Sequence, residues 1–228
     1  YSESTSSGAF TFTTPNAGTS GISGGFTLTT GTASNGDSGG FALSTGDATS
    51  GKSGSMLLKL GTGNTGHGGS FELDVGDTTG SDGDGGSITV TAGHSNDASG
   101  NHGGSIAITA GHTKGSETSD NGGSITVNAG LAATGNGGNI DISTGYSEST
   151  SSGAFTFTTP NAGSNGVSGG FKFSTGASTG GDSGSFSLTT GDAVNGKAGS
   201  FVMKVGSGNT GVGGDISVAA GETTDAAS

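Results

Sequence analysis

The chain has 228 residues, of which 53 are Gly and 27% are hydrophobic, and its formal net charge is −12. This composition borders on that of disordered chains, because little apolar surface is available to offset the entropy of ordering. The acidic balance repels phosphate and so argues against nucleic acid as a partner, and no apolar run is long enough to predict a membrane span. There is no Cys, so disulfides cannot contribute to stability.

A short pattern recurs fourteen times, and each unit starts from an anchor glycine two residues before a large apolar residue. The anchors are Gly8, Gly24, Gly39, Gly54, Gly69, Gly86, Gly104, Gly123, Gly138, Gly153, Gly169, Gly184, Gly199 and Gly214. Residues 1–18 and 146–163 are identical, so a 145-residue super-repeat overlies the units, with a first copy at 1–145 and a partial second copy at 146–228. We therefore expect a single repeat array over 1–228, taken from a longer array.

Two positions in every unit are apolar without exception, and their spacing of two residues places them on one face of a β-strand. The first row is Phe10, Phe26, Phe41, Met56, Phe71, Ile88, Ile106, Ile125, Ile140, Phe155, Phe171, Phe186, Phe201 and Ile216. The second row is Phe12, Leu28, Leu43, Leu58, Leu73, Val90, Ile108, Val127, Ile142, Phe157, Phe173, Leu188, Met203 and Val218. We interpret the two rows as the structural core.

The strand pattern ends at the same place in every unit, where Gly permits a positive φ or Pro removes a donor. Pro15 and Pro160 end two of the units. The turn glycines that end the others are Gly31, Gly46, Gly61, Gly76, Gly93, Gly111, Gly130, Gly145, Gly176, Gly191, Gly206 and Gly221.

These features predict an all-β fold, a parallel β-solenoid of about fourteen short coils with about 15 residues per coil. Equivalent residues would stack in columns about 4.8 Å apart along the axis, with like residues on like. An antiparallel meander is the alternative, but it needs long loops between single strands where tight turns are preferred.

Three units have longer loops, at 76–84, 94–102 and 112–121, and these contain the candidate metal ligands. His94 and His112 follow the turn glycine in successive coils, and Asp82 and Asp84 lie in a Gly/Asp-rich segment similar to the turns of calcium-binding β-rolls. The tight His spacing of zinc sites is absent. Ordinary exposed loops are the favoured interpretation, with loosely bound Ca²⁺ as the alternative and no cofactor expected.

We expect no enzymatic activity, because the chain lacks Arg, Trp and any clustered constellation of catalytic residues. Outward Thr pairs such as Thr11 and Thr13 form the rows that an ice-binding or adhesive surface would use. Charged residues interrupt those rows at Lys59, Glu72, Asp74, Lys172 and Lys204.

Units such as Gly85-Gly86-Ser87-Ile88-Thr89-Val90-Thr91-Ala92-Gly93 resemble the Gly/Ser/Thr-rich β-solenoid repeats of secreted and cell-surface proteins in diatoms and related algae. The resemblance implies an extracellular or cell-surface structural or adhesive role. The leading hypothesis is a segment of a long extracellular fibre or surface-layer filament. Its partners would be copies of itself, end-to-end and side-by-side, with possible contact to a surface or glycan. The alternative is a binding module, an adhesin or ice-binding surface.

Overall fold

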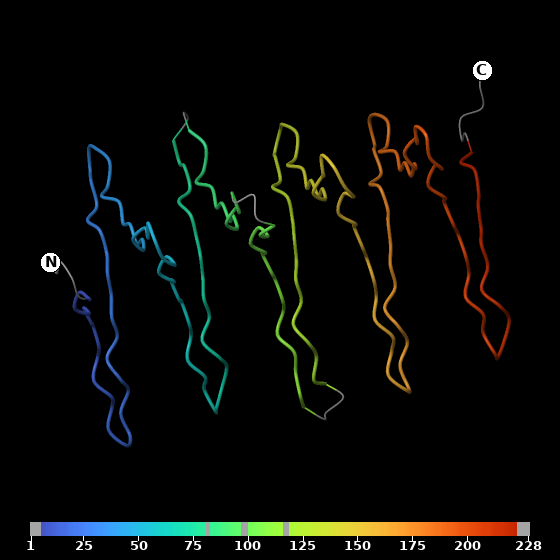
Figure 1. Ribbon diagram of the computed structural model, residues 1–228. Helices are drawn as coiled ribbons and strands as arrows, with labels where there is room; N and C mark the ends of the chain where they lie inside the picture. The colour runs from blue at the N-terminus through green and yellow to red at the C-terminus, as the bar shows by residue number, and fades with distance from the viewer. Residues whose placement is uncertain (1–5, 81–82, 97–99, 116–118, 223–228) are drawn as a thin grey trace. The chain divides into compact units, whose positions relative to one another are not determined.

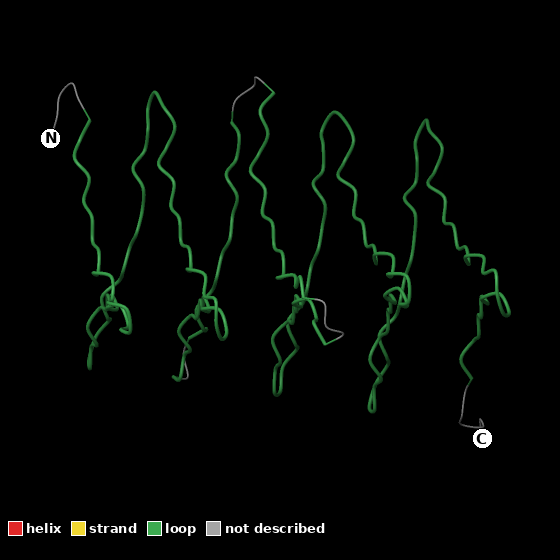
Figure 2. Cartoon of the chain, turned by 90° about the horizontal axis from the view of Figure 1, so that it is seen from below, coloured by secondary structure: helices red, strands yellow, loops and turns green. Residues whose placement is uncertain are grey.

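The computed structural model describes residues 6–80, 83–96, 100–115 and 119–222, and in these ranges it contains no helix and no β-strand. Figure 2 accordingly draws all the described residues as loop. Extended segments carry the apolar rows, and bends or turns separate them, for example at 34–36, 64–66 and 194–196.

Two units can be distinguished, Tyr1–Thr109 and Ala110–Ser228, and the same local pattern is found within each. Each consists of extended segments that alternate in direction, with a loop at every reversal (Figure 1). The boundary between the units falls inside the repeat that starts at Gly104, and it does not coincide with the end of the first super-repeat copy.

Successive segments keep the same register across most of the reversals. A methyl group added at Gly24 would lie 3.6 Å from Cβ of Thr14, and the ring centroids of Phe12 and Phe26 are 5.7 Å apart. Gly24 thus faces Thr14, and Phe26 faces Phe12, so residue numbers rise along one segment where they fall along the other. This is the register of an antiparallel pair. The residue at the end of one segment lies beside the anchor glycine of the next in the same way at six further reversals. The pairs are Thr30 and Gly39, Thr45 and Gly54, Val75 and Gly86, Thr159 and Gly169, Thr175 and Gly184, and Thr190 and Gly199.

Five reversals are closed by a backbone hydrogen bond that we term the glycine clasp. The N–H of the anchor glycine donates to the C=O of the preceding turn glycine at 2.8 or 2.9 Å. The clasps join Gly86 to Gly76, Gly104 to Gly93, Gly123 to Gly111, Gly138 to Gly130, and Gly153 to Gly145. Glycine permits this close approach, since a methyl group added at Gly104 would lie only 3.2 Å from the nitrogen of Gly93.

The prediction of a parallel β-solenoid is wrong, and the clasps give the physical reason. In a solenoid coil the chain crosses back before the next strand starts, so the end of a five-residue strand lies about 15 Å from the start of the next. In each clasp these two points are 2.8 or 2.9 Å apart. The solenoid would also stack first-row residues on first-row residues and second-row residues on second-row residues. Instead, Phe12 of the second row contacts Phe26 of the first row.

The reversals follow the path of the antiparallel alternative, but they do not build a sheet. Beyond the clasps, no ladder of backbone hydrogen bonds connects neighbouring segments in the ranges that the structure describes. A single clasp fixes the two ends of a loop. The backbone of the rest of each described segment forms no hydrogen bond with its neighbour. The β-class prediction therefore fails at the level of hydrogen bonding.

The described residues also include no buried side chain, so no core is present. The chain exposes 22743 Å². A compact chain of this mass would expose about 9,000 Å² and a fully extended one about 31,000 Å². Two large side chains per unit stabilise by about 1.5–3 kcal/mol each when fully buried, whereas ordering 15 residues costs roughly 20 kcal/mol. A single unit therefore cannot bury its rows alone.

Candidate functional site

The apolar rows are the most prominent chemical feature, and the two row residues of each extended segment lie on the same face. Phe10 and Phe12, two residues apart, meet edge to face with ring centroids 4.8 Å apart and an interplanar angle of 86°. The repeated copy has the same contact between Phe155 and Phe157, at 4.5 Å and 85°. The alternation predicted from the sequence thus places both rows on one side, where their rings can touch.

Aromatic contacts also connect neighbouring segments across three of the reversals. The rings of Phe157 and Phe171 lie 5.3 Å apart at 40°, and this pair repeats the Phe12–Phe26 pair of the first copy. Phe173 and Phe186 lie 5.6 Å apart at 35°. Such tilted pairs contribute about 0.5–1.5 kcal/mol beyond the area they bury.

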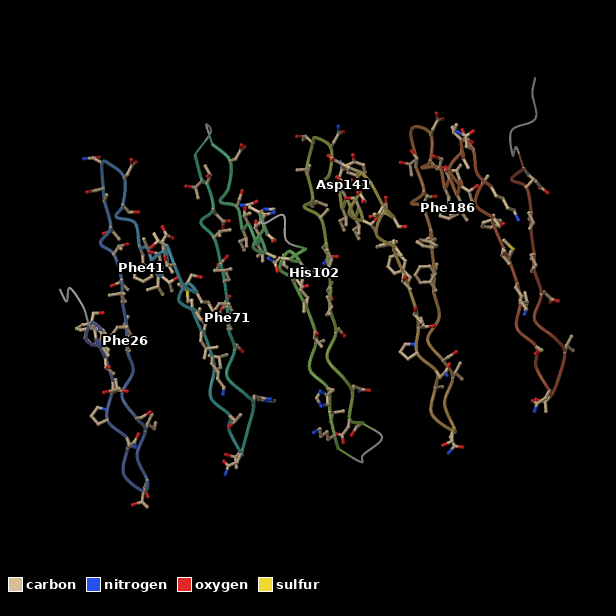
Figure 3. All side chains as sticks on the ribbon, viewed as in Figure 1. Phe26, Phe41, Phe71, His102, Asp141 and Phe186 are labelled. Atoms are coloured by element: carbon tan, nitrogen blue, oxygen red, sulfur yellow. The ribbon has the colours of Figure 1, made fainter. Side chains whose placement is uncertain are left out.

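These contacts leave most of each row side chain exposed. Across the two rows the exposed fraction runs from 49% at Met56 to 88% at Val218. In Figure 3 the side chains, including the labelled Phe26, Phe41 and Phe71, stand off single extended segments. The rows are therefore apolar surface that lacks a covering layer in the described parts of the chain.

Apolar notches recur at one place in the repeat, between the second-row residue of one segment and the first-row residue of the next. The notch of the first copy, about 370 Å³, is lined by Phe12, Thr13, Thr14 and Phe26. Its equivalent in the second copy, about 200 Å³, is lined by Phe157, Thr158, Thr159 and Phe171. A third notch, about 660 Å³, is lined by Leu58, Lys59, Leu60 and Phe71.

Further exposed aliphatic residues project from the loops that connect the rows. Ile22, Val167 and Val212 lie two residues before an anchor and are 97–100% exposed. Leu131 is equally exposed in its loop, at 98%, and Val194 is 89% exposed. The chain thus carries both apolar notches and exposed apolar projections.

In the part of the chain that the structure describes, the candidate metal ligands are not gathered into a site. Asp82 lies outside the described residues, and the backbone oxygen of Asp84 accepts a hydrogen bond from Thr78 Oγ1 at 2.7 Å. His94 and His112 are exposed on separate loops. No group of three His, Asp or Glu side chains in the described ranges is close enough to hold a metal ion.

The turn glycines have two different environments. Gly76, Gly93, Gly111, Gly130 and Gly145 accept the clasp hydrogen bonds. The other turn glycines accept no such bond in the described residues. The sequence carried a signal for the clasps that we did not use. The pattern Gly-Gly-x-Ile begins at Gly85, Gly103, Gly122, Gly137 and Gly213, and the first four of these precede a clasped anchor.

The chain matches no family model, no curated protein and no solved structure. No helix in the described residues is long and apolar enough to cross a membrane. The rows, the notches and the repeat are therefore the features from which a function can be inferred.

Proposed function

We propose that the chain is a structural segment of a repeat-built filament or surface layer outside the cell, and that copies of the chain cover its apolar rows. The observation that carries the proposal is the combination of an apolar residue at all twenty-eight row positions with an exposed fraction of at least 49% at each. Exposed apolar side chains that recur in this way are typical of an interaction surface. Removing the exposed part of one row side chain from water stabilises by about 1–2 kcal/mol.

A second copy is the partner that the repeat supports. Every unit has two apolar row residues at the same spacing of two residues. If one unit of a copy fits against a unit of a second copy, the following units of the two copies fit in the same way. An interface needs about 1,200 Å² or more in total to be stable, which one notch cannot supply. A series of units can supply this area, and a head-to-tail contact that does not close continues as a filament.

The charge of the chain sets the conditions for assembly. Copies with a net charge of −12 repel one another, and six Lys residues only partly offset eighteen acidic ones. Salt shortens the range of this repulsion from about 10 Å at 0.1 M to about 3 Å at 1 M. We therefore expect the apolar contact between copies to prevail at high ionic strength.

The test is to follow the purified chain by sedimentation velocity and negative-stain electron microscopy across a salt series. The proposal predicts large, elongated assemblies whose fraction increases with salt and protein concentration. A chain that stays monomeric at every salt concentration, while its rows still bind an apolar dye, would overturn it.

A further inference from the structure

The chain contains five Asn-Gly pairs, at Asn35, Asn121, Asn136, Asn165 and Asn195, each in an exposed loop between apolar segments. The two residues of such a pair can react with each other, through the asparagine side chain and the glycine nitrogen. The backbone nitrogen of the glycine attacks Cγ of the asparagine, a carbon–nitrogen bond forms, and the amide nitrogen leaves as ammonia. Water then opens the cyclic imide at either carbonyl and gives aspartate or isoaspartate. Glycine favours the attack, because it has no side chain to block its nitrogen.

The reaction depends on local backbone geometry, and the five pairs differ in it. The nitrogen of Gly166 is held in a turn, where it donates to the backbone oxygen of Gly163 at 3.2 Å. The side-chain amide nitrogen of Asn121 donates to the backbone oxygen of Ser119 at 3.2 Å, which fixes the group that must be attacked. Both contacts oppose ring closure.

Asn35 and Asn195 form a matched pair. Their loops, 31–39 and 191–199, have equal length, begin and end with glycine, and place Asn-Gly at the same position. Asn195 has φ of 61°, in the left-handed region, whereas Asn35 does not have a positive φ. In the left-handed region ψ is near +30° to +60°, which turns the next nitrogen away from Cβ. Gly196 therefore points its nitrogen away from the Asn195 side chain.

We propose that Asn35 is a site of spontaneous conversion to aspartate and isoaspartate, and that the left-handed backbone of Asn195 protects the equivalent site. Nothing in the described residues restrains Asn35 in the same way, because the nitrogen of Gly36 donates no hydrogen bond there. Conversion adds a negative charge to an already acidic chain, and the isoaspartyl product lengthens the backbone of the loop.

The experiment is peptide-level mass spectrometry of the intact purified chain, aged at mildly alkaline pH, with isoaspartate separated from aspartate by chromatography. We expect Asn35 to convert several-fold faster than Asn195, and Asn165 to be slow as well. Gly36→Ala should strongly reduce conversion at Asn35, since a side chain then hinders the attacking nitrogen.

The residue before each asparagine also affects the rate, so the control is Val194→Ser, which gives Asn195 the same preceding residue as Asn35. In native buffer this variant should keep Asn195 slow, and in concentrated urea the two sites should convert at similar rates. Equal rates in native buffer in the Val194→Ser variant would overturn the proposal. A difference that persists unchanged in urea would also overturn it, because the cause would then be the sequence and not the backbone geometry.

Discussion

The stretch from Gly76 to Gly153 and the Phe-rich stretches on either side of it reverse the chain by different means. In the first, the anchor and turn glycines join in five clasps, although the residues between them vary in number. In the Phe-rich stretches, rings pair across three of the reversals. In the described residues, no reversal has both a clasp and a ring pair.

The residue facing the anchor glycine accounts for part of this difference, at three of the five clasps. Ala92, Ala110 and Ala129 face clasped anchors, and their single methyl groups let the two backbones approach. Thr30 and Thr45 face unclasped anchors, and their branched side chains fill the space beside the glycine. Val75 and Thr144 also face clasped anchors, Gly86 and Gly153, so a branched side chain does not prevent the backbone bond.

The largest effect is expected from a charge in an apolar row. Phe157→Asp removes a ring from two aromatic contacts and places a carboxylate on the face that copies should cover, so we expect assembly to be abolished. Thr156→Asp is the matched control, because it adds the same charge on the opposite face of the same segment, at a residue that does not line the notch, and should reduce assembly only slightly. Sedimentation velocity at high salt measures both. Equal loss in the two variants would show that charge alone, and not the row, controls assembly.

A smaller effect is expected from filling the space inside a clasp. Gly104→Ala would place Cβ 3.2 Å from the nitrogen of Gly93 and 3.4 Å from Cβ of Ala92, so the clasp should weaken by about 1 kcal/mol. In Gly103→Ala the nearest atom to the new Cβ is the oxygen of Gly93 at 3.7 Å, which is ordinary contact. Amide hydrogen exchange at position 104 should accelerate in the first variant and not in the second. Unchanged exchange in Gly104→Ala would contradict the clasp.

The smallest effect is expected from a single ring pair. A double-mutant cycle with Phe157→Leu and Phe171→Leu should give a coupling of about 0.5–1.5 kcal/mol in assembly free energy. The corresponding cycle with Phe157→Leu and Phe201→Leu should give no coupling, because no contact connects those rings in the structure. Equal coupling in both cycles would mean that the rings act as general apolar area and not as pairs.

The sequence predicted which residues share a face, and it failed on the direction of the chain. Alternation with a period of two places Phe10 and Phe12 on one side, and that holds whether the next segment runs parallel or antiparallel. The residues between Gly130 and Gly138 are enough either to return across a coil or to close a loop. The clasp closes these residues into a loop. In the sequence, only the small residue Ala129 and the glycine pair Gly137-Gly138 indicate this closure.

The candidate sites were less predictable still. The notches depend on which segment lies beside which, so Phe12 and Phe26 could be recognised as row residues but not as the walls of one notch. The left-handed backbone of Asn195 and the ordinary backbone of Asn35 occur in loops with the same Asn-Gly signal. Sequence identifies the reactive pair, and structure is needed to distinguish the two.

Disulfide trapping tests the reversal of direction most directly, because the chain has no Cys of its own. A Cβ at Gly39 would lie 3.7 Å from Cβ of Thr30, within the range of about 3.5–4.5 Å that a disulfide requires. Stacking of like on like would instead bring Thr30 beside Thr45. We predict that the variant Thr30→Cys with Gly39→Cys forms an intramolecular disulfide readily and that Thr30→Cys with Thr45→Cys does not. Efficient bond formation in the second variant and none in the first would contradict the account.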